Sequence, residues 1–188
     1  MPLTTIYTSS QVGTNTDTTI SYRQRCVLTG GGQRAQVSFT CVAGGSWIAD
    51  HASVGILTGT NWDTTATPVE LTFSSGGHGF NVAATGQTIV SDEIDLGTPF
   101  TSSNKLVVII DWNASNGASW LFGTAANCDA GYFTTASGGY NIASAGAPGL
   151  GSNLSKADAG LVLIQAEPAA GAPIAKPIRR VIPVRRIG

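Results

Sequence analysis

The chain has 188 residues, of which 42% are hydrophobic and 11% are charged, and its formal net charge is −1. This length is enough for one domain with its own core, and the apolar content excludes an intrinsically disordered chain. The 24 glycines and the low charge are typical of an all-β body with many tight turns.

The small net charge hides an asymmetry along the chain. Residues 1–167 carry five basic and eleven acidic side chains, a net charge of −6, whereas residues 168–188 carry five basic side chains and no acidic one. We therefore expect two parts: a β-sandwich body over residues 1–166, which begins with an extended segment, and a proline-rich basic arm over residues 167–188.

The three cysteines, Cys26, Cys41 and Cys128, show neither CxxC nor Cys/His spacing, so we predict no zinc site and no disulfide framework. Cys26 and Cys41 fall at core-facing positions, where cysteine commonly acts as a small apolar filler. The opening residues show no signal peptide, and no segment has the apolar length of a membrane helix. We expect synthesis in a reducing cytoplasm.

Two alternating runs come first, joined by three glycines at residues 30–32. This pattern predicts an antiparallel hairpin. The residues expected on the apolar faces are Ile20, Tyr22, Cys26 and Leu28 in the first run, and Ala35, Val37, Phe39 and Cys41 in the second.

Three further strands are expected before the middle of the chain. Residues 47–57 read as one long strand with an irregularity near Asp50 and His51. Residues 69–73 alternate strictly, and residues 89–96 read as a strand with Val90, Asp92, Ile94 and Leu96 on one face.

The segment 105–112 contains five consecutive aliphatic residues between Lys105 and Asp111. β-Branching and the polar residues on both sides favour a central strand with both faces covered. The cover is either a second layer of structure on each side, or the core on one face and a long loop or a partner chain on the other. Residues 159–166 form a second apolar run, expected as the last strand. The fold class predicted is all-β, an antiparallel β-sandwich, jelly-roll-like, with about eight to ten strands.

The search for catalytic chemistry returns little. Asp50 and His51 are adjacent, so their side chains diverge in a regular strand, and His78 lies among glycines and reads as a turn residue. No nucleophile motif accompanies either histidine. The acidic residues Asp92, Glu93 and Asp95 are explained better as solvated edge charges than as calcium ligands. We predict no enzyme activity, no catalytic residue, no metal and no cofactor.

Aromatic residues leave a second role open. Trp62, Trp112 and Trp120 fall at strand ends or in loops, where exposed rings could stack on sugars. Packing in the core or against a neighbouring subunit is the competing explanation.

The arm combines recurrent prolines, which favour an extended chain, with aliphatic and basic side chains. It has no aromatic residue to stack on bases, so we expect it to dock on an acidic, partly apolar protein surface and not on nucleic acid. The residues expected to bind the partner are Ile174, Lys176, Ile178, Arg179, Arg180, Ile182, Arg185 and Arg186.

The glycine-, threonine- and alanine-rich body resembles the jelly-roll modules of tailed-bacteriophage virions, which serve as capsid decoration or cement proteins or as head-fibre and tail-adhesin pieces. Three segments are also similar to the accessory β-sandwich that precedes some SGNH esterase domains: residues 71–77, 91–96 and 106–110. That second resemblance implies a sandwich that attaches to something, and it implies no esterase activity.

The first resemblance implies a non-enzymatic virion protein, made in the host cytoplasm, of the capsid decoration or cement type. Its expected partners are capsid or tail subunits and further copies of itself, as a homotrimer, without a membrane. The alternative is a carbohydrate-binding, receptor-binding module of a phage fibre or adhesin. A hydrolase, which would need His51 or His78 beside a serine and a carboxylate, is the third candidate.

Overall fold

The structure is a computed structural model that describes residues 2–9, 11–17, 21–40, 47–59, 62–82, 87–112, 118–123, 128–134, 153–154 and 161–167. At some of these positions, including Trp112 and Trp120, only the backbone is described. Within these ranges the secondary structure is entirely β, and no helix there is long and apolar enough to cross a membrane.

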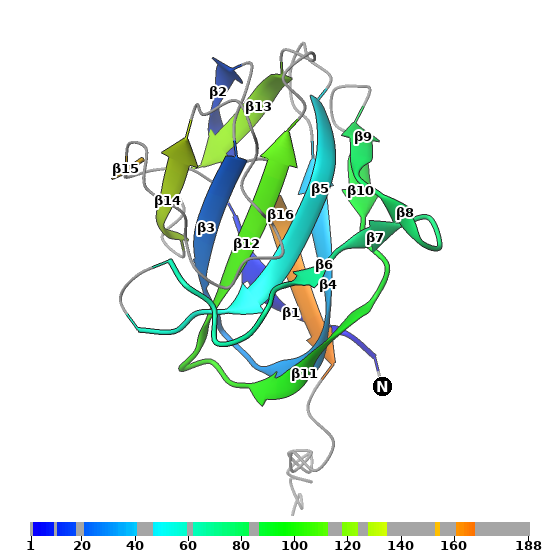
Figure 1. Cartoon of the computed structure of the whole chain (residues 1–188), viewed down its shortest axis with the longest axis vertical. Helices are drawn as coiled ribbons and strands as arrows, with labels where there is room; N and C mark the ends of the chain where they lie inside the picture. The colour runs from blue at the N-terminus through cyan, green and yellow to red at the C-terminus, as the bar shows by residue number, and fades with distance from the viewer. Residues whose placement is uncertain are drawn as a thin grey trace, which may run out of the picture.

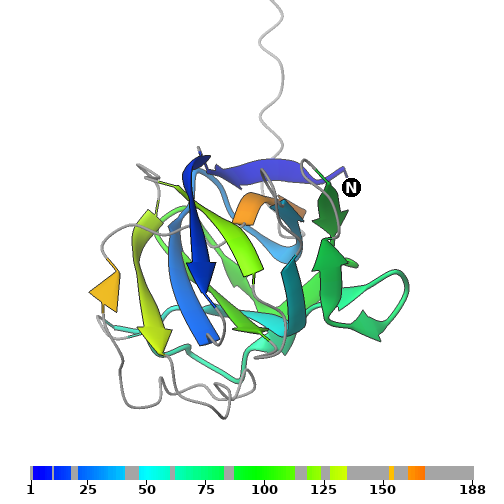
Figure 2. The same ribbon diagram turned by 90° about the horizontal axis from the view of Figure 1, so that it is seen from above.

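Two antiparallel sheets pack face to face, which confirms the predicted all-β sandwich (Figures 1 and 2). The five-stranded sheet has the order β1–β16–β4–β10, with β11 also paired to β4. Its strands are β1 (Thr4–Thr8), β16 (Leu161–Glu167), β4 (Gly32–Thr40), β10 (Thr88–Val90) and β11 (Ile94–Phe100).

The seven-stranded sheet has the order β15–β14–β3–β12–β5–β6, with β9 also paired to β5. Its strands are β15 (Asn153–Leu154), β14 (Cys128–Thr134), β3 (Ser21–Val27), β12 (Lys105–Trp112), β5 (Trp47–Ile56), β6 (Val69–Glu70) and β9 (Phe80–Val82). Two smaller pairs join β13 (Ala118–Gly123) to β2 (Gln11–Asp17), and β7 (Thr72–Phe73) to β8 (Gly77–His78).

The described chain contains 16 strand segments, more than the predicted eight to ten. Part of the difference arises because two predicted strands are broken, and the rest because β2, β8, β14 and β15 lie where no strand was predicted. Residues 69–73 divide into β6, which pairs with β5, and β7, which pairs with β8. Residues 89–96 divide into β10 and β11, and Val90 is 44% exposed while Ile94, predicted on the same face, is buried.

The strand β12 is central and covered on both faces, as its sequence predicts. It lies between β3 and β5 in the larger sheet. Leu106, Val108 and Ile110 belong to the main core, and Val107 and Ile109, on the opposite face, are also fully buried. A strand with this burial pattern needs a second layer outside the sandwich.

The second layer is the chain between β5 and β6, which crosses the outer face of the larger sheet (Figure 1). The Thr65 amide donates to the Ile56 carbonyl at 2.8 Å, which holds the segment against β5. On β3, the buried Arg23 donates from Nη1 to the Trp62 carbonyl at 2.7 Å, and the Arg25 guanidinium lies 4.2 Å from the centre of the Trp62 ring. The long loop between β5 and β6 therefore covers this face of β12, as one of the two predicted alternatives has it.

The predicted hairpin between the first two alternating runs is wrong. β3 pairs with β12 and β14 in one sheet, whereas β4 pairs with β16, β10 and β11 in the other. The glycines at 30–32 carry the chain from one sheet to the other. A Cβ on Gly32 would overlap the carbonyl oxygen of Glu167, so this crossing requires a residue without a side chain.

The expected faces of these two runs are nevertheless correct where side chains are described. Cys26, Leu28, Ala35, Val37 and Phe39 all lie in the main core. Burial therefore follows the alternation, while the choice of strand partner depends on contacts that are distant in sequence.

The prediction of one strand over residues 47–57 is confirmed as β5, including its irregularity. Opposite β5, Asp111 pairs with His51 and Trp112 pairs with Ala49, so Asp50 is an extra residue in a β-bulge. Ala49 and Ala52 both face the core, while Asp50 and His51 are both exposed.

Candidate functional site

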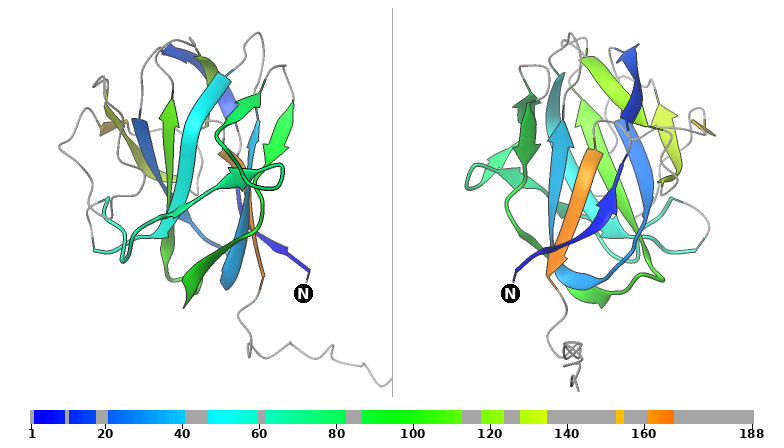
Figure 3. Two further views of the ribbon diagram at one scale, coloured as in Figure 1. Left: turned by 45° about the vertical axis from the view of Figure 1, so that its right-hand side comes forward. Right: turned by 180° about the vertical axis from the view of Figure 1, so that it is seen from behind.

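The residues predicted to bind a partner, between Ile174 and Arg186, lie outside the described part of the chain. The body that precedes them ends at Glu167, the last residue of β16. Because Thr4 pairs with Ala166, β16 finishes at the end of the sandwich where β1 begins (Figure 3).

Of the three tryptophans predicted to stack on sugars, the structure describes the side chain of one, Trp62. Trp62 is only 3% exposed, because its ring packs on the outer face of the sheet beside Arg25, so it presents no open ring to a sugar. The side chains of Trp112 and Trp120 are not described. Every other aromatic side chain that is described is also buried, so the glycan-binding hypothesis now depends on Trp112 and Trp120.

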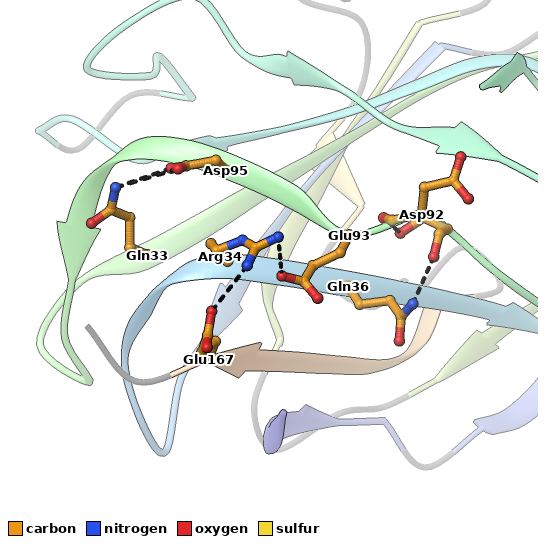
Figure 4. Close-up of polar contacts among 8 residues, drawn as sticks. Gln33, Arg34, Gln36, Asp92, Glu93, Asp95 and Glu167 are labelled. Atoms are coloured by element: carbon orange, nitrogen blue, oxygen red, sulfur yellow. Dashed lines mark hydrogen bonds and ion pairs between the residues drawn. The ribbon is translucent and has the colours of Figure 1, made fainter. Parts of the chain in front are cut away.

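The acidic residues near the start of β11 do not gather around one point. Arg34 on β4 contacts Glu93 at 2.7 Å and Glu167 at 3.4 Å, and Asp95 accepts a hydrogen bond from Gln33 (Figure 4). Asp92 binds a different segment, described below. Asp92, Glu93 and Asp95 therefore bind three different protein partners, as expected for charges along a sheet edge and not for a calcium site.

The clearest cluster of reactive side chains joins three residues that are far apart in sequence: His51, Glu70 and His78. The Nδ1 atoms of both histidines approach the same carboxylate oxygen, Oε1 of Glu70, at 2.6 Å from His51 and 3.0 Å from His78. The two imidazole rings are 6.2 Å apart, centre to centre. We call these three residues the His–Glu–His cluster.

The larger sheet positions the first two members. The bulge at Asp50 turns His51 away from the core while Ala52 points into it. Glu70 on β6 pairs with Ser53, two residues along β5 from His51, so the two side chains lie on the same face. A hydrogen bond from the Leu71 amide to the Ala52 carbonyl, 2.8 Å long, continues this attachment beyond β6.

The third member, His78, comes from the short hairpin of β7 and β8, which lies beside β5 and β6 (Figure 1). Its turn has three consecutive residues with positive φ: Ser74 at 53°, Ser75 at 69° and Gly76 at 109°. This conformation is unfavourable for serine and needs outside support. The Asp92 carboxylate supplies it by accepting hydrogen bonds from the Ser75 amide at 3.1 Å, the Gly76 amide at 2.9 Å and the Thr72 hydroxyl at 2.8 Å.

Gly79, the residue after His78, fixes how closely the hairpin approaches β5. Its φ is +68°, and a Cβ there would lie 2.5 Å from the carbonyl oxygens of both Ala49 and Asp50. The backbone that carries His78 therefore packs directly on the backbone just before His51. Phe80 then anchors the chain in the core, where its ring stacks on Phe39 at 4.7 Å.

Electrostatics in the cluster favour an ionised carboxylate. Partial burial raises the pKa of Glu70, but hydrogen bonds from His51 and His78, together with the positive charge that each imidazole carries when protonated, outweigh the burial and leave the pKa below its usual value. Glu70 is thus an anion toward which two imidazoles point. The side chains remain open to solvent, at 46% exposed for His51, 34% for Glu70 and 60% for His78.

Acid is expected to loosen the turn that presents His78. Hydrogen bonds from the Ser75 amide, the Thr72 hydroxyl and the Gly76 amide lower the pKa of Asp92 from 3.8. A lowered pKa in the folded state means that this stabilisation is complete above pH 3.8 and is lost as the pH falls through the folded-state pKa. Thermal melts of Asp92→Asn should therefore show less loss of stability between neutral pH and pH 3 than the wild type. An unchanged loss in the variant would contradict this assignment.

Sequence reasoning considered the two histidines one at a time and missed the cluster. It considered His51 only beside its neighbour Asp50 and rejected that pair, whereas the structure pairs His51 with Glu70. The available signals were the irregularity at Asp50, the outward position of Glu70 in an alternating run, and the glycine after His78. None of these gives the spatial relation between the three segments.

Comparison with protein-family models gives no match, and comparison with curated proteins gives no relative of this chain. Its function is therefore argued from its own residues.

Proposed function

We propose that this chain is a non-enzymatic structural protein of a bacteriophage virion, of the capsid decoration or cement type. In this proposal the β-sandwich is a compact body, and residues 168–188 attach it to a lattice of other virion proteins. The site of attachment is a capsid or tail subunit, and the body assembles as a homo-oligomer.

The observation that carries the proposal is the position of β16, the last described strand. β16 is paired on one side with β1 and on the other with β4, so it is an interior strand of its sheet (Figure 3). The sheet needs no further strand next to β16. In our proposal, the 21 residues after Glu167 make their contacts outside the body.

The composition of these residues supports attachment to protein. The arm carries five basic side chains, and Arg179, Arg180, Arg185 and Arg186 occur as two pairs among isoleucine, valine and proline. Guanidinium groups form forked hydrogen bonds with carboxylates, and aliphatic side chains gain free energy when they are buried. A capsid surface with acidic groups around apolar grooves would bind the arginines and the aliphatic side chains of the arm together.

The direct test is incorporation into particles. The full chain, a truncation that lacks residues 168–188, and a variant with the four arm arginines changed to glutamine are each added to particles of the parent phage. We expect the truncated body to fold, with a cooperative melt near that of the wild type, but to bind particles at least about tenfold less, which corresponds to about 1.4 kcal/mol. Particle binding by the glutamine variant should be intermediate between that of the full chain and that of the truncation.

Arg34→Gln is the matched control for loss of an arginine. Arg34 lies on β4, and its side chain is 51% exposed and paired with carboxylates of the same body. Its incorporation should equal that of the wild type. Equal incorporation of the truncated chain and the full chain would refute the role of the arm.

A further inference from the structure

We propose that the His–Glu–His cluster binds one divalent transition-metal ion, of the class represented by Zn²⁺. This is a function beyond the attachment proposed above, and it depends on residues of the body alone.

The donor set fits this class of ion. Two imidazoles and one carboxylate form the ligand set of many zinc and non-haem iron sites, whereas calcium and magnesium prefer oxygen ligands only. The set carries one negative charge from Glu70, because neutral imidazole is the form that binds a metal. No thiol belongs to the cluster, and the described Cys26 is buried in the core.

The distances also fit. Ligand atoms at about 2.0–2.2 Å from an ion are roughly 3.3–3.5 Å apart across a tetrahedral angle. Here the ligand atoms of all three residues lie within 4.8 Å of one another, and the two nitrogen-to-oxygen distances are 2.6 Å and 3.0 Å. Small side-chain rotations therefore bring the three donors to bonding distance of one ion. The ion takes the place of the two hydrogen bonds on Oε1, and the proton of each imidazole moves from Nδ1 to Nε2.

The backbone around the cluster is arranged before any ion arrives. The bulge at Asp50, the packing of Gly79 on β5 and the turn held by Asp92 each use an unusual backbone feature, and all three adjoin the cluster. Bulges and strained backbone are common beside functional sites. The three ligands come from β5, β6 and β8, so binding fastens the short β7–β8 hairpin to the larger sheet.

Three protein ligands leave at least one coordination position for water or for a group from another molecule. The exposure of the histidines, 46% and 60%, places that position at the surface of the sandwich. The site is therefore an open one, unlike a closed structural zinc site with four protein ligands.

The test uses the full chain without a polyhistidine tag, stripped with a chelator and titrated with ZnCl₂ by calorimetry. The expected result is one ion per chain. Melting temperature should rise by about 5–10 °C when free Zn²⁺ is 100 times the dissociation constant. Co²⁺ should give visible d–d bands without a thiolate charge-transfer band, which would separate this site from binding by cysteine.

Variants locate the ion. His51→Ala and His78→Ala should each weaken Zn²⁺ binding at least about 100-fold, and Glu70→Gln about 10- to 100-fold. Glu93→Gln is the matched control, because it removes a carboxylate paired with Arg34 and should bind Zn²⁺ like the wild type. All the variants change exposed or half-buried side chains, so their metal-free melts should stay near that of the wild type.

Three outcomes would overturn the proposal. The first is no binding by the wild type, which would leave the cluster as a hydrogen-bond network only. The second is equal binding by the wild type and by the double variant His51→Ala/His78→Ala. The third is a Co²⁺ spectrum dominated by thiolate. None of these outcomes bears on particle incorporation, so the two proposals fail independently.

Discussion

Replacing Ile109 with alanine is expected to destabilise the protein by about 2–4 kcal/mol, although its side chain points away from the main core. Ile109 is fully buried, and on the flanking strands it pairs with Arg23 and Ser53, which are also fully buried. The cavity would open beneath the segment that carries Trp62. Urea unfolding should show a lower midpoint with an unchanged m value.

Two further variants make this result interpretable. Ile110→Ala removes the same atoms from the inner face of β12, where the side chain is also fully buried, and should cost about as much. Val90→Ala changes a side chain that is 44% exposed and should cost less than about 1 kcal/mol. A change within about 0.5 kcal/mol for Ile109→Ala would show that the outer face of β12 is not covered.

The second large effect is expected at Gly79. Gly79→Ala puts a Cβ against the carbonyl oxygens of Ala49 and Asp50, at 2.5 Å from each, and forces alanine to keep a φ of +68°. The left-handed conformation costs about 1–2 kcal/mol and the overlap about 1–3 kcal/mol more, so we expect a total loss of about 2–5 kcal/mol. Because relief of the overlap moves β8 away from β5, the variant should also bind Zn²⁺ more weakly while all three ligands remain.

Gly59→Ala separates the two contributions. Gly59 has a φ of +61°, but apart from its chain neighbours no atom of the described residues lies within 4 Å of the position of its Cβ. It should therefore show only the conformational cost of about 1–2 kcal/mol. Equal losses in Gly59→Ala and Gly79→Ala would mean that close packing of β8 on β5 is not required.

Much of the fold follows from local patterns in the sequence. The aliphatic run of β12 is long enough, and β-branched enough, to indicate a central strand covered on both faces. The alternation in β4 correctly assigns Ala35, Val37 and Phe39 to the core. The irregularity near Asp50 is visible because two polar residues interrupt an otherwise apolar strand.

The strand partners could not be predicted in the same way. A glycine-rich connection between two alternating runs normally joins a hairpin, but at residues 30–32 it joins two sheets. What decides between the two is the fit of Gly32 against β16, a strand about 130 positions further along the chain. Hydrophobic periodicity carries no information about such a contact.

The His–Glu–His cluster was unpredictable for a related reason. His51, Glu70 and His78 belong to three strands whose relative positions depend on a bulge, a left-handed glycine and a carboxylate that holds a turn. Each feature has a signal in the sequence, but the sequence pattern does not show that the folded chain brings the three together. The arm, in contrast, could be recognised from the sequence, because its charge and proline content are evident from composition alone.

The most direct test of the division into body and arm is an electron cryomicroscopy map of a particle that carries this protein. Our account predicts continuous density for residues 168–188 along the surface of another virion subunit, with Arg179, Arg180, Arg185 and Arg186 next to its acidic side chains. Density for the same residues as an added strand on their own sandwich, with no contact to another subunit, would contradict it.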